Sequence, residues 1–327
     1  MSGPRRARRA AFGASVVLAL LASASFAADP RESESAEPEQ SATDVNKALT
    51  NPVSDIWSIT FQQNNFLLKH QLPGGLGDAL AGQTHDRSDW SNNLLFQPVL
   101  PVSISERWNL ITRPVIPLIV SQPHPNENPR SSDFLDIERA NAFGDITLLQ
   151  LVSPSPKLAG HWLLGLGPTW MFPSAGSDFT GAGKYQVGPA GIVGYLGDKW
   201  IAGALVQNWW SFAGEDDRAD TNGMNLQPFA SYFLPEGWSV GYSGNVLANW
   251  KARDGDQWTV PIGLSVAKVV KAGKLPIRIA LAGQWMPVHP EQFGQKWNIQ
   301  LVFSPVIPKL VKGELSDPKS LHFGLGR

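Results

Sequence analysis

Two neighbouring segments decide the fold: WSVGYSGNVLANW at positions 238–250 and WTVPIGLSVAK at positions 258–268. In the first, one face carries large apolar residues and the other small or polar ones: Trp238, Val240, Tyr242, Val246, Ala248 and Trp250 against Ser239, Gly241, Ser243, Asn245 and Asn249. The second sets Trp258, Val260, Ile262, Leu264 and Val266 against Thr259, Pro261, Gly263, Ser265 and Ala267. This period of two predicts β-strands with one apolar face and one polar or small face.

The next two segments along the chain, residues 277–285 and 297–303, repeat the alternation. Ile277, Ile279, Leu281 and Trp285 alternate with Arg278, Ala280, Ala282 and Gln284, and Trp297, Ile299, Leu301 and Phe303 alternate with Asn298 and Gln300. Segments 144–152 and 224–233 alternate less cleanly. An apolar outer face and a polar inner face are typical of strands in a transmembrane β-barrel.

The connections between strand-like segments alternate between short and long. Twelve segments of about eight to twelve residues are expected. The short connections are residues 105–107, 153–161, 197–199, 235–237 and 271–274; the long ones are residues 64–89, 121–143, 173–184, 212–223, 251–257 and 287–295. We therefore predict an all-β fold, an antiparallel transmembrane β-barrel of 12 strands with short periplasmic turns and long extracellular loops.

The N-terminus reads as an export signal. Arg5, Arg6, Arg8 and Arg9 precede an apolar run, and Ser25-Phe26-Ala27 has the small-x-small form of a cleavage site. Without this segment, 23 of the 27 basic residues remain against 28 acidic ones, a balance of −5 that argues against nucleic acid as a partner. The chain has no cysteine, which excludes a disulfide framework.

The expected organisation is a signal peptide (residues 1–27), a disordered periplasmic lead (28–52), a barrel (53–305) and a C-terminal periplasmic tail (306–327). The lead is acidic and lacks aromatic residues, with a helical turn expected near residues 44–49. The tail is weak in strand character. No mature segment approaches about 18 consecutive apolar residues, so a membrane-spanning form of this chain requires a closed barrel.

Tryptophans gather at both ends of the expected strands. Trp108, Trp162, Trp200 and Trp238 follow short turns directly. Others sit beside long loops: Trp90, Trp170, Trp209, Trp210, Trp250, Trp258, Trp285 and Trp297. We predict an interfacial girdle formed by Trp108, Trp162, Trp200, Trp238, Trp250, Trp258, Trp285 and Trp297, rather than the plugs of a water-soluble core.

Prolines inside the expected strands oppose the barrel interpretation, because each removes one hydrogen bond from the sheet. They are Pro98, Pro114, Pro117, Pro189, Pro228 and Pro261. The near-repeat QPVLP at 97–101 and RPVIP at 113–117 lies on two successive strands. We expect it to mark an irregularity that both strands share.

These proline motifs also carry a family resemblance. The motifs that carry it are NPV (51–53), FQQNN (61–65), FQPVLP (96–101), WNLITR (108–113), GDI (144–146), GLGP (165–168), WSFAG (210–214), NLQPF (225–229) and QWTVP (257–261). In this order, over about residues 44–305, the chain resembles the outer-membrane channel family of the meta-cleavage pathway of phenol degradation, often labelled "transporter" or "neuromedin U". The resemblance implies an outer-membrane barrel that passes small aromatic or hydrophobic compounds, and it supplies no catalytic residues. One departure is the stretch after Phe303, where barrels of this kind usually end.

Arg113 and Arg278 lie on the polar faces of their strands and are expected to point into the lumen, because a charge facing lipid is costly. There they would select permeants by charge. An internal ion pair, for instance with Asp145, is the alternative. The other expected pore-lining residues are Gln97, Gln227, Asn245 and Gln300.

No enzymatic machinery is expected. The six histidines (His70, His85, His124, His161, His289 and His322) are expected in loops, a turn or the tail, and no Gly-x-Ser-x-Gly or His-Glu-x-x-His motif occurs. The acidic run 215–220 lacks the glycine and terminal glutamate of a calcium loop. The sequence thus predicts no catalytic residues, no metal site and no cofactor.

The function expected from the sequence is passive passage of small molecules across the outer membrane of a Gram-negative bacterium. Its partners would be outer-membrane lipids, lipopolysaccharide and a small-molecule permeant. A structural or adhesin-like plugged barrel, a lipid-hydrolysing barrel enzyme and a soluble periplasmic sandwich are the alternatives.

Overall fold

The computed structural model describes residues 41–72, 85–125 and 137–323. The expected signal peptide, most of the expected lead and the tips of the first two long loops lie outside these residues. The described residues belong to one compact unit, Gln40–Arg327. None of its helices in the described part has the length and apolar character needed to cross a membrane.

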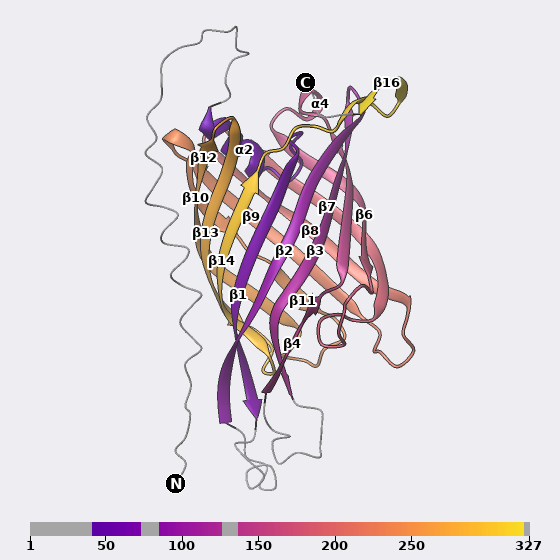
Figure 1. Cartoon of the computed structure of the whole chain (residues 1–327), viewed down its shortest axis with the longest axis vertical. Coiled ribbons are helices and arrows are strands. Elements are labelled where there is room, and N and C mark those ends of the chain that lie inside the picture. The colour runs from indigo at the N-terminus through magenta and orange to yellow at the C-terminus, as the bar shows by residue number, and fades with distance from the viewer. Residues whose placement is uncertain (1–40, 73–84, 126–136, 324–327) are drawn as a thin grey trace, which may run out of the picture. The chain divides into compact units, whose positions relative to one another are not determined.

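The described chain is almost entirely β-structure (Figure 1). Its strands are β1 (Ser58–Leu72), β2 (His85–Ser105), β3 (Trp108–Pro125), β4 (Ile137–Phe143), β5 (Ile146–Pro154), β6 (Trp162–Phe172), β7 (Lys184–Leu196), β8 (Trp200–Gly214), β9 (Asn222–Phe233), β10 (Trp238–Ser243), β11 (Val246–Asn249), β12 (Trp258–Ala272), β13 (Leu275–Val288), β14 (Gly294–Pro305), β15 (Val311–Glu314) and β16 (Asp317–Phe323). The helices are α2 (Ala42–Thr50), α4 (Pro156–Ala159) and a 3-10 turn, η1 (Pro235–Gly237).

The sheet closes on itself. Each wall strand pairs antiparallel with its neighbour along the chain, and β1 pairs with β14, from Phe61 opposite Phe303 to Lys69 opposite Gly294. β4 and β5 succeed each other beside β3, and β10 and β11 share one position between β9 and β12. The wall therefore has twelve strands within the described residues, which confirms the predicted all-β antiparallel barrel.

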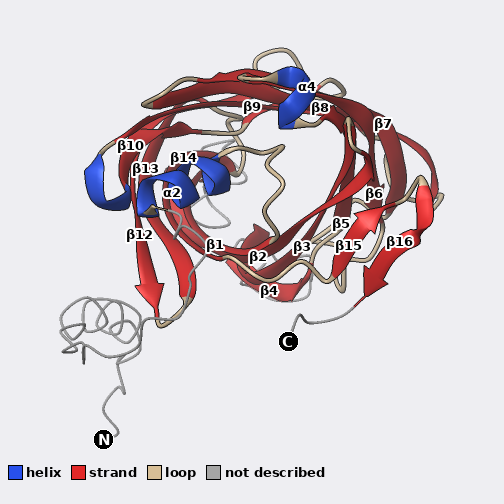
Figure 2. Cartoon of the chain, turned by 90° about the horizontal axis from the view of Figure 1, so that it is seen from above, coloured by secondary structure: helices blue, strands red, loops and turns tan. Residues whose placement is uncertain are grey.

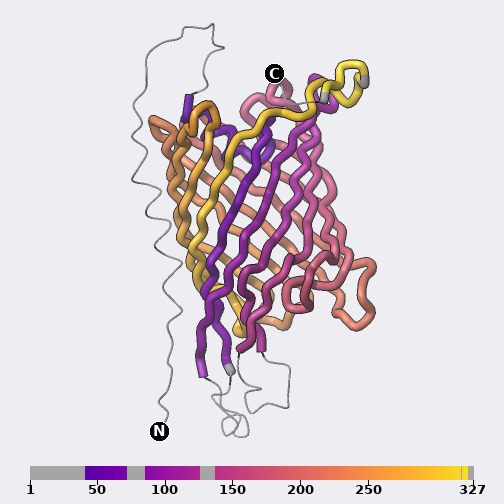
Figure 3. The backbone as a smooth tube through the Cα atoms, viewed as in Figure 1, coloured from indigo at the N-terminus to yellow at the C-terminus, as the bar shows by residue number. Residues whose placement is uncertain are grey.

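The short and long connections lie at opposite ends of the barrel, as predicted, but several strands are longer than expected (Figure 3). β1 and β2 stay paired from Ser58 opposite Val99 to Leu72 opposite His85, well into the expected first loop. This extension corrects the expected place of three histidines: His70, His85 and His124 lie in strands β1, β2 and β3. These strand ends are mostly polar on both faces and lack the alternation of apolar and polar residues that identifies a strand in a sequence.

The predicted two-faced strands are confirmed in β12, β13 and β14. Leu264 and Leu281 on the outer face are 60% and 57% exposed, whereas Ala267 and Asn298 on the inner face are 3% and 2% exposed. The alternation is weaker in β5 and β9 for a physical reason: Leu149, Leu151, Phe229 and Phe233 point inward and are buried, so both faces of these strands are apolar there.

Several interruptions of the wall lie beside prolines. The β2–β3 pairing stops between Phe96 opposite Ile116 and Leu100 opposite Thr112, where Pro98 and Pro114 face each other. Pairing of these two prolines with β1 and β5 is continuous, so the missing N–H donors are both directed at the same gap. The shared irregularity predicted for the two motifs is therefore present.

The two composite strands have the same origin. Pro117 on β3 lies beside the break between β4 and β5, where its carbonyl accepts a hydrogen bond from the Gly144 amide at 2.8 Å. Pro228 on β9 lies beside the break between β10 and β11, opposite Gly244. Proline has no backbone N–H, so the strand that pairs with it loses one hydrogen bond. Each break falls at the position where this hydrogen bond is missing.

Pro168 on β6 and Pro189 on β7 face each other inside an unbroken β6–β7 ladder. The gaps appear instead on the outer sides of this hairpin, between β5 and β6 opposite Gln150 and between β7 and β8 opposite Asn208. The two missing donors therefore point away from each other, toward β5 and β8.

Helix α2 lies within the ring of strands at the short-turn end (Figure 2). Ser41 caps its first turn by accepting a hydrogen bond from the Asp44 amide at 3.1 Å, and Val45 and Asn46 are buried. The helix is longer than the helical turn expected near residues 44–49, and it packs on the barrel.

The C-terminal tail was expected to be weak in strand character, and this expectation is wrong for the described part. β15 and β16 form a short antiparallel hairpin, which places His322 in a strand, and Glu314 pairs with Ser103 of β2 in parallel. The hairpin turns at Leu315 and Ser316, whose amides donate to the carbonyls of Ser103 and Ile104 at 2.9 Å. Short polar strands such as these carry no apolar period in the sequence.

The exposed apolar side chains of the outer face, among them Ile262, Leu264, Leu281 and Ile299, are here called the apolar belt. They lead to a testable prediction. Leu264→Arg places a charge at the middle of the outer face of β12 and is expected to lower the free energy of unfolding from phospholipid vesicles by about 2–4 kcal/mol. Urea titrations that follow the gel mobility of unheated samples measure this change. Leu264→Ala is the control, and equal effects of both substitutions would contradict a lipid-facing position.

Candidate functional site

The lumen holds two cavities on either side of a group of side chains, here called the neck. The loop-side cavity, toward the long loops, has a volume of about 460 Å³, and the turn-side cavity, beside α2, has about 170 Å³. Three side chains line both cavities: Gln62 of β1, Arg113 of β3 and Gln227 of β9. They define the neck, because the two cavities share them.

All six residues predicted to line a pore line these cavities. Gln97 and Asn245 line the loop-side cavity, Arg278 and Gln300 line the turn-side cavity, and Arg113 and Gln227 line both. Their contact with a permeant stays a prediction.

A chain of side-chain amides, here called the amide belt, follows the inner wall at the neck. Its members are Gln97, Gln62, Asn64, Gln300, Asn298, Gln284 and Gln227, joined by Ser243. Gln97 donates to Gln62 Oε1 at 3.2 Å, and Gln62 donates to Asn64 Oδ1 at 3.2 Å. Asn64 Oδ1 also accepts from Gln300 at 2.9 Å, so this side chain is the centre of the belt.

The belt continues along β13 to β9. Asn298 donates to Gln284 Oε1 at 3.0 Å, Gln284 donates to the Ser243 carbonyl at 2.8 Å, and Gln227 donates to the Ser243 hydroxyl at 3.1 Å. Asn64, Asn298 and Gln284 are at most 4% exposed. Buried amides need partners, and here they satisfy one another, which fixes the side chains that border the neck.

The arginines are held by neutral groups. Arg113 Nη2 donates to Gln97 Oε1, and Arg278 Nε donates to Asn46 Oδ1 of α2 at 3.0 Å. The alternative of an ion pair with Asp145 is wrong, because that carboxylate accepts from the backbone amides of Ala175 and Ala182 at 3.2 and 2.6 Å and secures the loop after β6. Among the described residues, no carboxylate lines either cavity.

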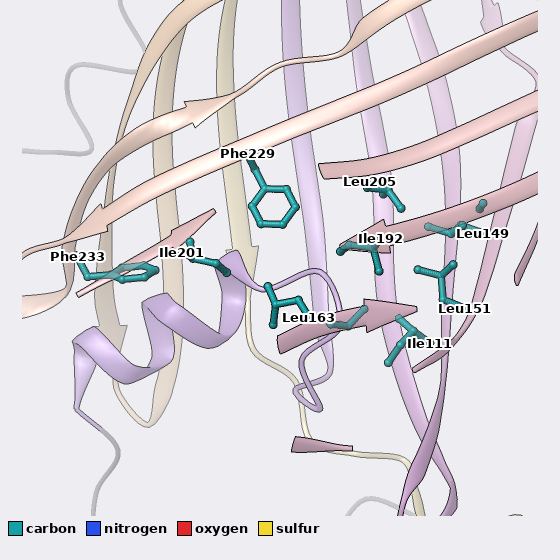
Figure 4. Packing of buried hydrophobic residues seen from close by; sticks show 11 residues of the cluster. Ile111, Leu149, Leu151, Leu163, Ile192, Ile201, Leu205, Phe229 and Phe233 are labelled. Atoms are coloured by element: carbon teal, nitrogen blue, oxygen red, sulfur yellow. The ribbon is translucent and has the colours of Figure 1, made fainter. Parts of the chain in front are cut away.

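The wall opposite the amide belt is apolar on its turn side (Figure 4). Its cluster comprises Val53, Ile111, Leu149, Leu151, Leu163, Ala190, Ile192, Ile201, Leu205, Phe229 and Phe233, from strands β3 to β9 and the segment after α2. Leu149 of this cluster lines the loop-side cavity and Phe229 lines the turn-side cavity, so apolar and polar side chains both face the lumen.

Trp209 belongs to this interior, although the sequence placed it at a strand end beside a long loop. It is 8% exposed, lines the loop-side cavity and donates from Nε1 to the Thr169 hydroxyl at 3.0 Å. The next residue, Trp210, is 46% exposed on the outer face. Successive residues of a strand face opposite sides, so the pair itself carried the signal that one of them points inward.

The other tryptophans mostly face outward. Trp108, Trp162, Trp200 and Trp238 are exposed at the short-turn end, and Trp250, Trp285 and Trp297 are exposed near the long loops. Trp258 is half-buried, with its ring edge-on to Trp250 at 5.2 Å between centroids. These positions are compatible with an interfacial girdle, which stays a prediction.

Asn46 holds α2 in the mouth of the barrel and was missed in the sequence. It is fully buried, and its side-chain amide donates to the Gly237 carbonyl at 2.9 Å and to the Ser239 hydroxyl at 3.0 Å. Together with the bond from Arg278 it joins α2 to η1, β10 and β13. An asparagine in a polar, acidic segment gives no sequence signal of this contact.

A second polar cluster lies at the loop end of β1 and β2. The fully buried His70 contacts Asp89 Oδ2 through Nε2 at 3.0 Å, and Arg139 of β4 contacts Asp89 Oδ1 at 2.8 Å. Phe293 stacks on the His70 ring with centroids 5.1 Å apart. This cluster fixes β1, β2 and β4 together; the described chain brings no group of three or more histidines and carboxylates together as a metal site.

The comparisons with known proteins support this architecture. The chain is similar to the crystal structure of the COG4313 outer membrane channel from Pseudomonas putida F1, with 14% identity and a TM-score of 0.55 over 79% of this chain and 98% of that one. It is less similar to the NanC porin (7% identity, TM-score 0.44, 76% and 99% covered) and to the Pseudomonas putida toluene transporter TodX (10%, 0.36, 79% and 92%). No protein-family model and no curated protein matches the sequence.

A similarity of this size to the first structure establishes the fold. Closure of the wall, its apolar outer face and its polar lumen define the class: a β-barrel of the outer-membrane type.

The Asn46 contacts lead to a prediction about α2. In Asn46→Ala the helix loses three buried hydrogen bonds, one of them to a charged group, and we expect hydrogen exchange of the α2 amides to speed up about 10- to 100-fold. Exchange mass spectrometry measures it, with barrel amides as an internal reference. Lys47→Ala, which removes only a 3.9 Å contact to Asp44, is the control and is expected to leave the rate nearly unchanged.

Proposed function

We propose that this protein is an outer-membrane channel for passive passage of small molecules. The observation that carries the proposal is the pair of cavities inside a closed wall, which share Gln62, Arg113 and Gln227 as lining residues. A barrel that served only as a scaffold would gain nothing from a lumen with space on both sides of a polar neck, since interiors of small barrels are otherwise filled by side chains.

Permeants that are partly hydrophobic fit the lumen best. Leu149 and Trp209 line the loop-side cavity together with the amides of Gln97 and Gln227, so a molecule with both kinds of surface meets a partner for each. The motifs shared with the meta-cleavage channel family favour small aromatic or hydrophobic compounds.

In this proposal the protein is exported by its cleaved signal peptide to the outer membrane, where the exposed apolar belt meets lipid. The tryptophan girdle would mark the two interfaces. The long loops would face outward and contact lipopolysaccharide, and the short turns and α2 would face the periplasm.

Helix α2 gives specific support to a gated rather than an open channel. Residues 48–51 line the turn-side cavity, and Asn46 ties the helix to the wall. The plugged-barrel alternative differs from this proposal only in whether the helix can leave its place. The lipid-hydrolysing alternative gains no support from His70, the fully buried histidine, because its partners are Asp89 and Phe293 and not a serine.

Planar-bilayer recordings of the folded full-length protein test the proposal. We expect the wild type to give infrequent current steps and Asn46→Ala to raise the open fraction about tenfold or more, because the helix loses its attachment. Lys47→Ala is expected to behave as wild type. Protein that shows a heat-dependent gel shift, and is therefore folded, but gives no current in either form would exclude a channel.

A further inference from the structure

We infer that the neck is a binding site for small amphipathic organic anions, with Arg113 holding a carboxylate and apolar side chains of the loop-side cavity holding an apolar body. This inference rests on the proposed channel function and names the substrate class of the same lumen. It starts from a side chain whose hydrogen-bonding capacity the protein leaves mostly unused.

Arg113 is the only cation that lines both cavities within the described residues. A guanidinium has five N–H donors in a planar fork. Nη2 donates to Gln97, whereas Nε is enclosed by protein and has no partner. In the described part of the chain, only Nη2 donates to a protein acceptor, so this guanidinium keeps capacity for an acceptor that a ligand supplies in the cavity.

The charge is uncompensated as well. Neither cavity is lined by an aspartate or glutamate of the described chain, and the amide oxygen of Gln97 is a neutral acceptor. Carboxylates pair with arginine through two parallel, charge-assisted hydrogen bonds, which neutral ligands cannot form. The site therefore favours a carboxylate over an alcohol of the same size.

Beside its amide and hydroxyl side chains, the loop-side cavity offers apolar surface that a bare inorganic ion would not use. Leu95, Val115, Leu149, Met171, Trp209 and Leu247 line it beside Arg113. Its volume of about 460 Å³ falls in the range of about 300–1,000 Å³ that small-molecule sites occupy. An anion with an apolar body would bury that body against these side chains, and this contact is the second half of the recognition.

The turn-side cavity offers a second position for the carboxylate of the ligand, beside Arg278. Arg278 lines it and donates to Asn46 of α2. A carboxylate that passes the neck would compete with Asn46 for this guanidinium, so the same ligand chemistry would loosen the attachment of α2 beside this cavity.

Calorimetric titration of the folded full-length protein in detergent tests the site, with benzoate, benzyl alcohol and inorganic phosphate at one ionic strength. Benzoate is expected to bind wild type more tightly than the other two. Arg113→Gln is expected to weaken benzoate binding about tenfold or more, since a hydrogen-bonded ion pair is lost. Arg107→Gln removes the same charge from the exposed turn between β2 and β3 and is the matched control, expected to change binding by less than about twofold.

Each other result would overturn the inference. Equal binding of benzoate and benzyl alcohol would mean recognition by apolar contact alone, and phosphate binding as tight as benzoate would mean an inorganic anion site. These comparisons use wild type only, so they hold even if Arg113→Gln does not fold, which its gel shift reports. The titration needs no current, so absence of binding in a conducting protein refutes this inference alone, and absence of current refutes the channel.

Discussion

Pairing of backbone N–H and C=O groups is the constraint on which the rest of the structure depends. A wall that faces lipid has no water to satisfy unpaired groups, so the sheet must close and each strand must have two neighbours. The β1–β14 pairing completes the ring and leaves one face of every strand toward the outside and one toward the lumen. Closure therefore creates the interior in which the amide belt and the two arginines lie.

Inside the barrel, side-chain groups rather than backbone groups must find hydrogen-bond partners. Its amides are removed from bulk water and bind one another, as Asn64 does by accepting from Gln62 and Gln300. Such a network has few alternative arrangements, because moving one amide leaves several others without partners. The apolar cluster has no such requirement, and Leu149 and Phe229 bring it to the surface of the two cavities.

Much of the fold could be predicted from the sequence, because alternation and turn lengths are local signals. Trp258–Ala272 has its apolar and small residues on the predicted faces, and the positions of Arg113 and Arg278 inside the lumen followed from the cost of a charge in lipid. Four features did not follow. Ala248, expected on the apolar outer face of segment 238–250, is buried and lines the loop-side cavity. The apolar inner face of β5 and β9 removes the period of two, the polar outer ends of β1 and β2 lack it, and Asn46 reaches its partners across about 190 residues of chain, a long-range contact that no local pattern encodes.

The arrangement of the prolines has a mechanical consequence. Where Pro98 faces Pro114, both absent donors weaken one seam; where Pro168 faces Pro189, the seam between them stays whole and the seams on either side are weakened. Neighbouring strands of the wall are therefore joined by unequal numbers of hydrogen bonds, and the β6–β7 hairpin is a fully paired unit with an interrupted pairing on each side. Local unfolding begins where cooperative units are joined most weakly, so we expect this barrel to open first between the strands whose pairing the prolines interrupt.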